Sequence, residues 1–416
     1  MKIAVVGSGI SGITAAYLLD KEHDVTLLEK ENRIGGHTNT ISFQGSDGES
    51  YAVDTGFIVL NDCNYGVFHN LLSEWEVDVR WSDMSFSYYD RATDYYYAGT
   101  DIFGLFPKWK LLYSKEHLQT IYEIVKFGKT AISFLESGVG AKDSLTLGRF
   151  LNERGFSKAF LNNYLLPMGS AIWSVPTGQI LEFPALSFIR FFKNHGLLSA
   201  SNRPRWQTIK GGSSAYLSKF KSKFNGTFLT NSNVSKISRS KEAVELSLSN
   251  GEVLSYDEIV LACHADGVLS LLENPSEEEE RLFSEWKYEN NTAILHTDSS
   301  IMPPKKVSWA SWNYHANTGY NAVLTYYMNK LQGVRSKDDY FVSLNCEDEI
   351  AERKIIKKID YTHPIFSLES LATQSQFKNL QGQNRTYYCG SYMGNGFHED
   401  GARSGAQVAL MKGITL

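Results

Sequence analysis

A short glycine-rich segment near the start of the chain has the spacing of a dinucleotide-binding loop. The segment Gly7–Gly12 reads G-x-G-x-x-G and stands between an apolar run and an amphipathic stretch. The first glycine of such a loop permits a tight turn, the second lets the backbone approach a pyrophosphate, and the third lets the helix pack close to the strand. The free N–H groups at the start of that helix would face the phosphates. The residues expected to contact the nucleotide here are Gly7, Gly9, Ile10, Ser11 and Gly12.

An acidic residue follows at the distance that such a site requires. Glu29 ends the second apolar run, Val25–Leu28, and Lys30 comes directly after it. A carboxylate at this point can accept hydrogen bonds from the hydroxyls of an adenosine ribose. Because the strand, the helix and the acid all fall in place, a nucleotide site explains the pattern better than a glycine turn in an unrelated α/β protein.

A second glycine pair indicates which dinucleotide is bound. Gly35 and Gly36 lie just after Glu29 and are followed by His37 and Thr38. Paired glycines mark another place where the backbone must pass close to something bulky. A nicotinamide domain has no obvious use for such a loop, whereas a flavoenzyme that holds FAD in an extended form does. The sequence therefore predicts FAD as the cofactor.

These segments resemble the flavin-containing amine oxidase superfamily, which includes monoamine oxidases, protoporphyrinogen oxidases and phytoene desaturases. The whole chain further resembles a bacterial subfamily of amine-oxidase-like proteins described as predicted NAD/FAD-binding. The segments that carry this resemblance are 35–40, 53–58, 82–86, 166–169, 310–314 and 396–401. Related proteins are often encoded near enzymes that modify acyl chains, and a related domain is fused to plant cyclopropane fatty acid synthases. The resemblance thus implies a lipid-like substrate.

The resemblance implies a cofactor site built from three separated stretches of the chain. In the middle stretch the backbone of Val234 would contact the adenine, and Ala262 would end a strand near the pyrophosphate. In the last stretch a helix starting near Ala402 would point its positive end at the flavin. The other implied contacts are Lys30, Gly35, Gly36, His37, Thr38, Thr55, Gly56, Phe57, Gly390, Ser391 and Gly401. Two residues depart from the superfamily pattern: His37 replaces the usual arginine, and Ser391 replaces the usual acid.

The candidate catalytic residues lie near the presumed flavin edge. His398 or Glu399 could remove a proton or orient the substrate. The alternative is that Glu399 and Asp400 simply cap the following helix. Tyr392 would be one of the two aromatic residues that often flank the flavin in amine oxidases. No cluster of metal ligands is expected, because none of the four cysteines lies in a C-x-x-C pair.

The expected architecture is an α/β fold, with a Rossmann-like FAD-binding domain and an interleaved α+β substrate domain of the amine oxidase and phytoene desaturase type. The FAD-binding domain would comprise residues 1–85, 205–290 and 380–416, and the substrate domain residues 86–204 and 291–379. Aromatic residues make up 13% of the chain, which suits a large apolar cavity. The aromatic residues that could line it are Trp173, Phe188, Phe191, Phe192, Trp206, Trp312, Tyr314 and Tyr392.

Composition limits the partners and the location. The chain of 416 residues has 41 Lys+Arg and 46 Asp+Glu, and a net charge of -5 argues against nucleic acid. No apolar run approaches the ~20 residues of a membrane span, so a cytoplasmic location is expected. The segment 102–113 mixes large apolar residues with two lysines, as interfacial membrane segments do, and a lid or core helix is the alternative interpretation. Peripheral membrane contact and the oligomeric state stay open.

The expected function is FAD-dependent two-electron oxidation, by hydride transfer to flavin N5, of an apolar substrate such as a fatty-acyl lipid. One alternative is an amine oxidase acting on a small amine or a polyamine. Another is an FAD-binding protein without net redox turnover, either mutase-like or a partner of a lipid-modifying methyltransferase.

Overall fold

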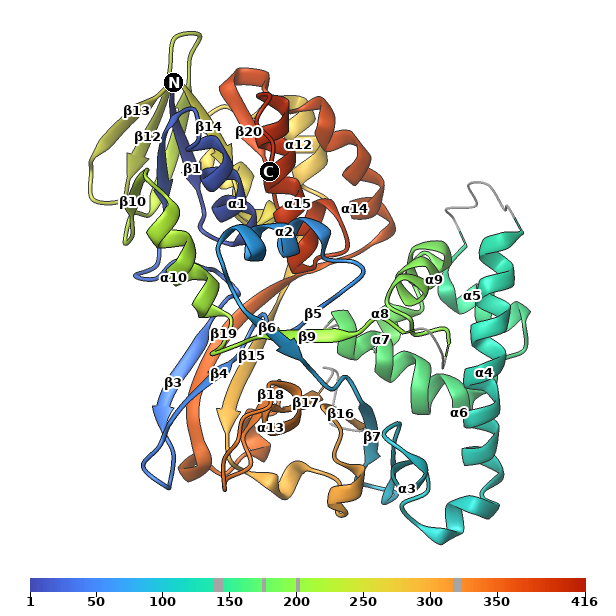
Figure 1. Ribbon diagram of the computed structural model, residues 1–416. Helices are drawn as coiled ribbons and strands as arrows, with labels where there is room; N and C mark the ends of the chain where they lie inside the picture. Colours follow the sequence, from blue (N-terminus) through green and yellow to red (C-terminus); the bar gives the residue numbers. More distant parts are fainter. Residues whose placement is uncertain (138–144, 174–176, 200–202, 317–322) are drawn as a thin grey trace.

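The computed structural model describes residues 1–137, 145–173, 177–199, 203–316 and 323–416. The chain has a mixed α/β fold, as expected from the sequence. Figure 1 shows two lobes, each built around its own sheet, with long strands running between them.

The first sheet is parallel and is assembled from distant parts of the sequence. Its order is β10-β2-β1-β14-β20, and every neighbouring pair is parallel. The strands are β1 (Lys2–Val6), β2 (Asp24–Leu28), β10 (Thr227–Leu229), β14 (Glu258–Leu261) and β20 (Thr386–Tyr388). All five lie within the three stretches expected for the FAD-binding domain. Apolar runs without strict alternation form them, because a parallel sheet is covered on both faces.

Two helices pack closely on one face of this sheet. Helix α1 (Ile10–Leu19) follows β1, and helix α15 (His398–Met411) returns from the C-terminal part of the chain to lie against it. A Cβ atom on Gly401 would lie 2.7 Å from Cγ2 of Ile10, and one on Gly405 would lie 2.2 Å from the carbonyl oxygen of Ser11. These glycines therefore allow the two helices to touch. Helices α2 (Gly66–Glu74) and α10 (Ser214–Lys223) complete this side of the lobe.

The opposite side of the first lobe carries a small antiparallel sheet and two helices. The sheet consists of β11 (Val234–Arg239), β12 (Val244–Leu248) and β13 (Val253–Tyr256). A turn at Asn250–Gly251 joins its last two strands. The helices are α11 (Ala265–Leu271) and α12 (Glu277–Phe283).

The second lobe is built on a seven-stranded sheet with the order β19-β15-β18-β17-β16-β7-β8. Its strands are β7 (Phe86–Asp90), β8 (Tyr95–Ala98), β15 (Lys287–His296), β16 (Trp312–Ala316), β17 (Val323–Tyr327), β18 (Phe341–Leu344) and β19 (Ile355–Ile365). The two longest strands, β15 and β19, pair antiparallel over ten positions and run up toward the first lobe (Figure 1). They form a continuous support between the two sheets.

Helices cover one side of the second lobe (Figure 1). They are α3 (Ile102–Leu105), α4 (Lys115–Glu136), α5 (Leu147–Glu153), α6 (Lys158–Phe160), α7 (Leu166–Trp173), α8 (Thr177–Ile180) and α9 (Ala185–Asn194). Two short helices, α13 (Met328–Leu331) and α14 (Leu368–Thr373), lie elsewhere. Among the described residues, no helix is long and apolar enough to cross a membrane.

Short strands join the lobes. The pair β3 (Thr40–Gln44) and β4 (Ser50–Asp54) is antiparallel. A second small sheet has the spatial order β5-β9-β6, with β5 (Leu60–Asn61), β9 (Trp206–Ile209) and β6 (Val79–Trp81). These strands bring Phe57 and Trp206 to the region between the two main sheets.

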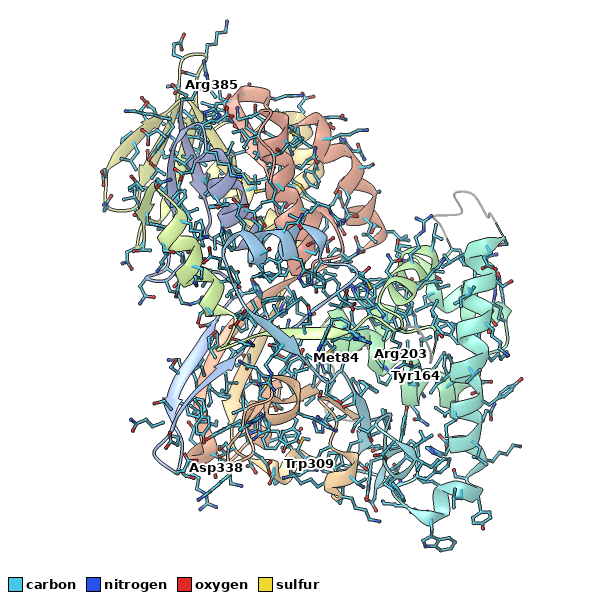
Figure 2. All side chains as sticks on the ribbon, in the orientation of Figure 1. Met84, Tyr164, Arg203, Trp309, Asp338 and Arg385 are labelled. Carbon is cyan, nitrogen blue, oxygen red and sulfur yellow. The ribbon has the colours of Figure 1, made fainter. Side chains whose placement is uncertain are left out.

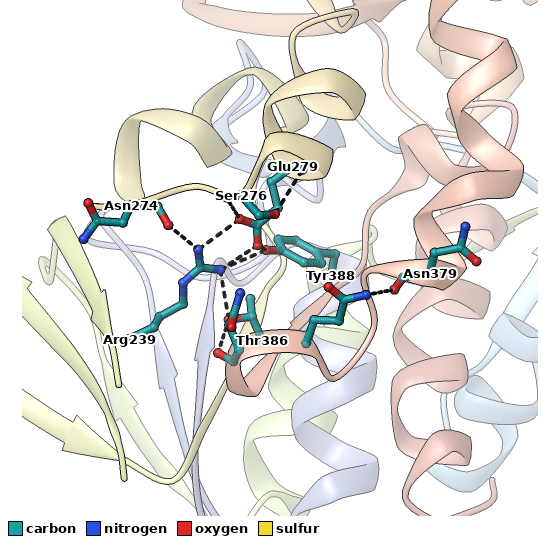
Figure 3. A network of polar contacts seen from close by, with 9 residues as sticks. Arg239, Asn274, Ser276, Glu279, Asn379, Thr386 and Tyr388 are labelled. Atoms are coloured by element: carbon teal, nitrogen blue, oxygen red, sulfur yellow. Dashed lines mark hydrogen bonds and ion pairs between the residues drawn. The ribbon is translucent and has the colours of Figure 1, made fainter. Parts of the chain in front are cut away.

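A buried polar network ties three elements of the first lobe together (Figure 3). Arg239 on β11 donates to both carboxylate oxygens of Glu279 on α12, at 2.6 and 2.9 Å, and to the carbonyl oxygen of Asn274 at 2.8 Å. The hydroxyl of Tyr388 on β20 also donates to Glu279. Burial opposes ionisation of Glu279, but the hydrogen bonds from Arg239 and Tyr388 hold the pKa of its carboxyl at about 2. Each charge in this network therefore has its partners.

Candidate cofactor and substrate site

A cavity of about 1150 Å³ lies where the ends of β1, β2 and β14 meet β15 and β19. Ligand sites are usually ~300–1,000 Å³, so this cavity has room for a long ligand or for two ligands side by side. Residues from all three stretches predicted to hold the cofactor line it. Of the predicted cofactor residues, those in the lining are Gly7, Gly9, Ile10, Ser11, Glu29, Lys30, Gly35, Gly36, His37, Gly56, Phe57, Val234, Ala262, Gly390 and Ser391.

The glycines of the first loop have different surroundings. Gly7 has a φ of +103°, and a Cβ atom on it would lie 2.7 Å from the carbonyl oxygen of Ala262. A Cβ atom on Gly12 would overlap the carbonyl oxygen of Gly7, so these two positions need glycine for close packing. A Cβ atom on Gly9 would have no heavy atom within 4 Å. Gly9 also lines the cavity, so the space beside it is where a pyrophosphate fits.

The start of α1 is suited to anion binding. Gly9 is its N-cap residue and provides no side-chain cap, so the first N–H groups of the ten-residue helix are left without a side-chain acceptor. Such N–H groups and the positive end of the helix dipole favour phosphate. Gly36 faces Gly9 from the second glycine loop, because its Cβ atom would lie 3.2 Å from Cα of Gly9. The two glycine segments thus touch each other, and both line this part of the cavity.

The Glu29 carboxylate is fixed in place at the end of β2. Its Oε2 accepts from the backbone N–H of Ser8 at 3.1 Å and from the Ser8 hydroxyl at 2.5 Å, and its Oε1 accepts from the N–H of Glu31 at 3.0 Å. Each carboxylate oxygen can accept more than one hydrogen bond, so capacity for ribose hydroxyls remains. The residues present therefore fit the adenosine diphosphate part of FAD.

Five predicted cofactor residues do not line the cavity, and we correct their roles. Gly12 and Gly401 serve close packing around α1, and Ala402 is fully buried beside them. The hydroxyl of Thr38 shares a hydrogen bond with the hydroxyl of Tyr216 at 2.6 Å. Thr55 donates to the carbonyl oxygen of Asn39 at 2.9 Å. These residues lie outside the cavity lining and support it through packing and hydrogen bonds. The glycine spacing for Gly12, and the family resemblance for the other four, placed these residues near the cofactor but could not show which way they face.

A cluster of histidines forms one wall. The ring centroid of His37 lies 5.0 Å from that of Tyr361, 5.2 Å from that of His363 and 6.0 Å from that of His264. Among the described residues, Nε2 of His37 and Nδ1 of His363 are buried without a hydrogen-bond partner. Burial lowers the pKa of all three imidazoles, that of His363 to about 4, so they are neutral at pH 7.

Unpartnered buried polar atoms are uncommon in folded proteins and indicate a missing ligand or water. The wall around His37 therefore provides donors and acceptors where the superfamily usually has an arginine. The sequence analysis missed Tyr361 and His363. Their alternate positions in the long strand β19 place them on the same face, and that polar pair is the signal that could have revealed them.

His398 lines the cavity at the first position of α15. Its ring stacks on Phe57 with centroids 3.7 Å apart, and Nε2 lies 3.1 Å from the hydroxyl of Tyr216. Burial lowers the pKa of His398 to about 3. An imidazole with this pKa is a weak base at pH 7. The geometry thus suits orientation and hydrogen bonding better than proton removal.

Tyr392 and Glu399 have surroundings that the sequence did not indicate. Tyr392 contributes to the cavity lining, but its ring is only 1% exposed and packs against Trp286 and Phe377. Burial raises the pKa of its hydroxyl well above the usual value. Glu399 is outside the lining and accepts from the N–H groups of Val67 at 3.0 Å and Phe68 at 2.9 Å.

These contacts correct the assignment of Glu399 as a catalytic residue, because its carboxylate caps the start of α2. The capping alternative is right for Asp400, which accepts from the N–H groups of Asn395 and Phe397 at the start of α15. Both acids are therefore committed to helix ends. Neither is available to a substrate.

Part of the cavity lining is apolar. Its apolar residues include Ile41, Ile58, Val59, Trp312, Tyr326 and Leu331, which pack in one hydrophobic cluster, and also Ile172, Trp173 and Trp206. The acidic residues of the lining are Glu29, Glu31, Asp266 and Asp360. Of the eight aromatic residues proposed from the sequence, Trp173, Trp206, Trp312 and Tyr392 line the cavity. The phenylalanines of α9 and Tyr314 belong to the hydrophobic core instead.

The family model for flavin containing amine oxidoreductase matches residues 10–340 of the chain. The chain is also 35% identical, over 69 residues, to the 4,4'-diapophytoene desaturase (4,4'-diaponeurosporene-forming) of Staphylococcus aureus strain MRSA252. That match covers 16% of this chain and spans only 13% of the length of the desaturase. The same enzyme from strain Newman matches over an equal length.

Solved structures share the fold over almost the whole chain. A putrescine oxidase matches with a TM-score of 0.70 and 13% identity, covering 99% of this chain and 98% of the other. A CLA-producing fatty acid isomerase from P. acnes matches with a TM-score of 0.71 and 14% identity, covering 98% of each. Cyclohexylamine oxidase from Brevibacterium oxydans IH-35A matches with a TM-score of 0.68 and 14% identity, covering 99% and 98%. At these identities the similarity establishes the fold.

The chain belongs to the family of flavin-containing amine oxidoreductases. By family it is an FAD-dependent oxidoreductase, and FAD is its cofactor. The glycine loops, the fixed carboxylate of Glu29 and the unpartnered atoms of His37 and His363 fit that cofactor.

Proposed function

We propose that this protein oxidises an apolar substrate, with a fatty-acyl chain as the best candidate. The observation that carries this proposal is the apolar part of the cavity lining, which has three tryptophans and a cluster of aliphatic residues packed beside Trp312 and Tyr326. An alkyl chain gains free energy by leaving water for such a surface, about 25 cal/mol per Å² buried. The 35% identity to part of a desaturase supports the same substrate class.

FAD, when bound, supplies a two-electron acceptor for a C–H bond. The chain's own residues bind, orient and exclude water. The two glycine loops and Glu29 hold the nucleotide part, and the neutral histidines offer hydrogen bonds without adding charge to the wall. The apolar lining residues would exclude water from the reacting carbon. His398 is fixed against Phe57 and Tyr216, so it would orient the substrate rather than take a proton.

A second candidate is a reaction on the same acyl substrate without net oxidation, such as movement of a double bond. The similarity of fold to a fatty acid isomerase favours this candidate. The same cavity would serve it. The two candidates differ in whether reduced cofactor and oxidised product accumulate.

An amine substrate receives less support. A protonated amine buried among the apolar lining residues would need a negative partner, which those side chains do not supply. Because the fold is shared with putrescine oxidase and cyclohexylamine oxidase, the test below includes amine substrates.

The test is anaerobic mixing of the FAD-loaded protein with saturated and unsaturated fatty acids, putrescine and cyclohexylamine. We expect an acyl compound to bleach the flavin band, with an added double bond found by mass spectrometry. Isomerised product without bleaching would favour the second candidate. Bleaching by an amine and not by any acyl compound would overturn the proposal.

A variant tests whether the substrate lies against the apolar lining residues of the cavity. Val59→Asp places a charge there, and we expect it to raise KM for the acyl substrate at least about tenfold because the carboxylate must be desolvated. Its flavin content should not change. Val253→Asp is the matched control, since Val253 is 58% exposed on β13 and is not part of the lining. Equal kinetics in both variants would contradict the placement of the substrate.

A further inference from the structure

Large apolar side chains cluster on the surface at one edge of the second lobe. Within residues 102–125 lie eight of the fifteen exposed large apolar side chains among the described residues. Phe103 is 72% exposed, and Trp109 and Tyr113 are each 78% exposed. Scattered apolar residues are normal on a protein surface, but a cluster of this kind marks an interaction site. We call Ile102, Phe103, Trp109, Leu112 and Tyr113 the apolar tip.

The apolar tip is part of an ordered segment. Asp101 caps α3 by accepting from the N–H of Gly104 at 2.8 Å, and Nε2 of His117 lies 3.0 Å from the carbonyl oxygen of Leu105. Lys305 donates to the carbonyl oxygen of Pro107 at 2.6 Å. Leu111, inside the same 3₁₀ turn as the exposed Trp109 and Tyr113, is only 4% exposed and anchors it to the core.

The backbone therefore holds the aromatic rings outward. The alternative interpretation of this segment was a lid or a core helix, and the exposed fractions exclude the core helix. In Figure 1 the tip lies at the lower edge of the molecule, around α3 and the start of α4. The neighbouring turn Lys306–Ser308 packs against α3, and its Val307 is 42% exposed.

Lysines outnumber acids in the segment 101–116, which carries the tip. Lys110 and Lys115 are exposed, and the side chain of neither forms an ion pair or hydrogen bond with another described residue. The two acids of the segment accept hydrogen bonds from neutral donors and keep their charge: Asp101 from the N–H of Gly104, and Glu116 from the side-chain amide of Asn163 at 3.1 Å. The segment therefore has a small positive excess, on a chain whose net charge is -5.

The combination of residues suits one kind of partner. Trp and Tyr prefer the boundary between lipid headgroups and acyl chains, because their rings are apolar and each carries one polar group. Phe and Ile insert slightly deeper, while lysines attract anionic headgroups. A protein partner would need acidic and apolar groups in matching positions, whereas an anionic bilayer supplies both without a fixed geometry.

We propose that the apolar tip docks this protein on the surface of an anionic lipid bilayer, with Phe103 and Trp109 inserted at the interface and Lys110 and Lys115 against the headgroups. The docking does not depend on the identity of the substrate.

Flotation of the FAD-loaded protein with lipid vesicles tests the proposal. The probes are vesicles of phosphatidylcholine alone and of phosphatidylcholine mixed with phosphatidylglycerol. We expect the protein to float with the mixed vesicles and only weakly with the neutral ones. Failure to bind the mixed vesicles at low salt would overturn the proposal.

Two double variants separate the apolar and the electrostatic contributions. Phe103→Ser with Trp109→Ser should weaken binding to mixed vesicles at least about tenfold, because the inserted area is lost. Trp81→Ser with Val253→Ser is the control, since both residues are more than half exposed outside the tip. Lys110→Glu with Lys115→Glu should weaken binding by about fivefold or more per lysine. Lys219→Glu with Lys221→Glu, on exposed lysines of α10, should change it less.

Fluorescence reports directly on Trp109. A blue shift on vesicle addition should appear in the wild type and be reduced in Trp109→Phe, which keeps the apolar side chain and should still float. Unchanged flavin content and unfolding midpoint in every variant show that the fold is intact. Equal loss of flotation in tip and control variants, or a dimer in sedimentation that Phe103→Ser with Trp109→Ser dissociates, would overturn membrane docking.

Discussion

Two buried polar regions of this molecule differ in how completely their hydrogen bonds are satisfied. Around Arg239 and Glu279 each charged group has several partners, supplied by β11, α12 and β20. Around His37 and His363 the rings lie close together, yet one nitrogen of each ring is without a partner among the described residues. Side chains are drawn throughout both lobes in Figure 2, and the His37 wall lies on the cavity between them.

The difference separates structural from functional polar groups. A fully satisfied network rigidifies a fold, whereas a buried group without a partner costs free energy unless a ligand completes it. The first region stabilises the first lobe. The second leaves donors and acceptors for the cofactor, at the position where the family usually has an arginine.

The largest effect is expected from breaking the satisfied region. Arg239→Met leaves Glu279 as a buried charge without its partner and should lower the free energy of unfolding by about 3–5 kcal/mol. Denaturant unfolding measures this change. Arg149→Met, at an exposed pair with Glu153, is the control and should cost about 1 kcal/mol or less. Similar losses in the two variants would contradict the distinction drawn here.

The next effect tests the open space beside the first glycine loop. Gly9 has φ −65° and ψ 175°, which any residue can adopt, so Gly9→Leu should fold with a loss of about 1 kcal/mol. Its side chain would occupy the place of the pyrophosphate and should abolish the yellow colour of the purified protein. Gly178→Leu is the control, because Gly178 is exposed and also has open space. Full flavin content in Gly9→Leu would refute the pyrophosphate site.

Because several histidines are buried in their neutral form, we expect the free energy of unfolding to decrease at acidic pH. The pKa of His296 is lowered to about 4 and that of His315 to about 3, both by burial. The unfolded chain has a histidine pKa near 6.5, so it binds more protons below that pH. Stability is therefore complete above about pH 6.5 and falls as pH decreases toward the folded values, by about 1–2 kcal/mol per histidine at pH 5.

Asp54 has the opposite effect on the pH dependence of stability. Burial raises its pKa to about 6, so the folded state holds that proton and gains stability as pH falls from about 6 to 4. Urea midpoints between pH 7 and pH 5 measure the sum, and we expect a net decrease. His315→Gln should reduce the slope, while an unchanged slope would show that this imidazole is not buried in its neutral form.

The smallest effect is expected at the cavity wall formed by His37 and His363, where two ring nitrogens have no hydrogen-bond partner among the described residues. His37→Ala should weaken FAD binding by about tenfold, the value of one hydrogen bond to a charged or buried partner. Titration of the apoprotein with FAD measures it. His296→Ala is the control, because its ring is already paired with Ser343 and with the N–H of Asp298. His296→Ala should lower the free energy of unfolding and leave the affinity for FAD unchanged. A loss of FAD affinity in His296→Ala with none in His37→Ala would contradict the distinction between the two regions.

The local pattern of the sequence predicted the parts of the fold that short segments dictate. The strand β1, its glycine loop, α1, β2 and the terminal Glu29 follow from apolar runs and glycine spacing. The resemblance then indicated that residues near 234, 262 and 390 return to the same cavity. The roles of single residues were harder: Glu399 lies beside His398 in the sequence, yet it caps a helix that begins more than three hundred residues earlier.

By itself, the sequence determined the dinucleotide loop, the cofactor class and the aromatic content, because these depend on backbone conformation and residue type within short segments. Only the tertiary structure decided that Gly9 faces open space while Gly12 and Gly401 serve packing, that β19 brings His363 to His37, and that Trp109 faces solvent. The physical reason is that a side chain's partners are set by distant elements packing together, which local spacing does not encode.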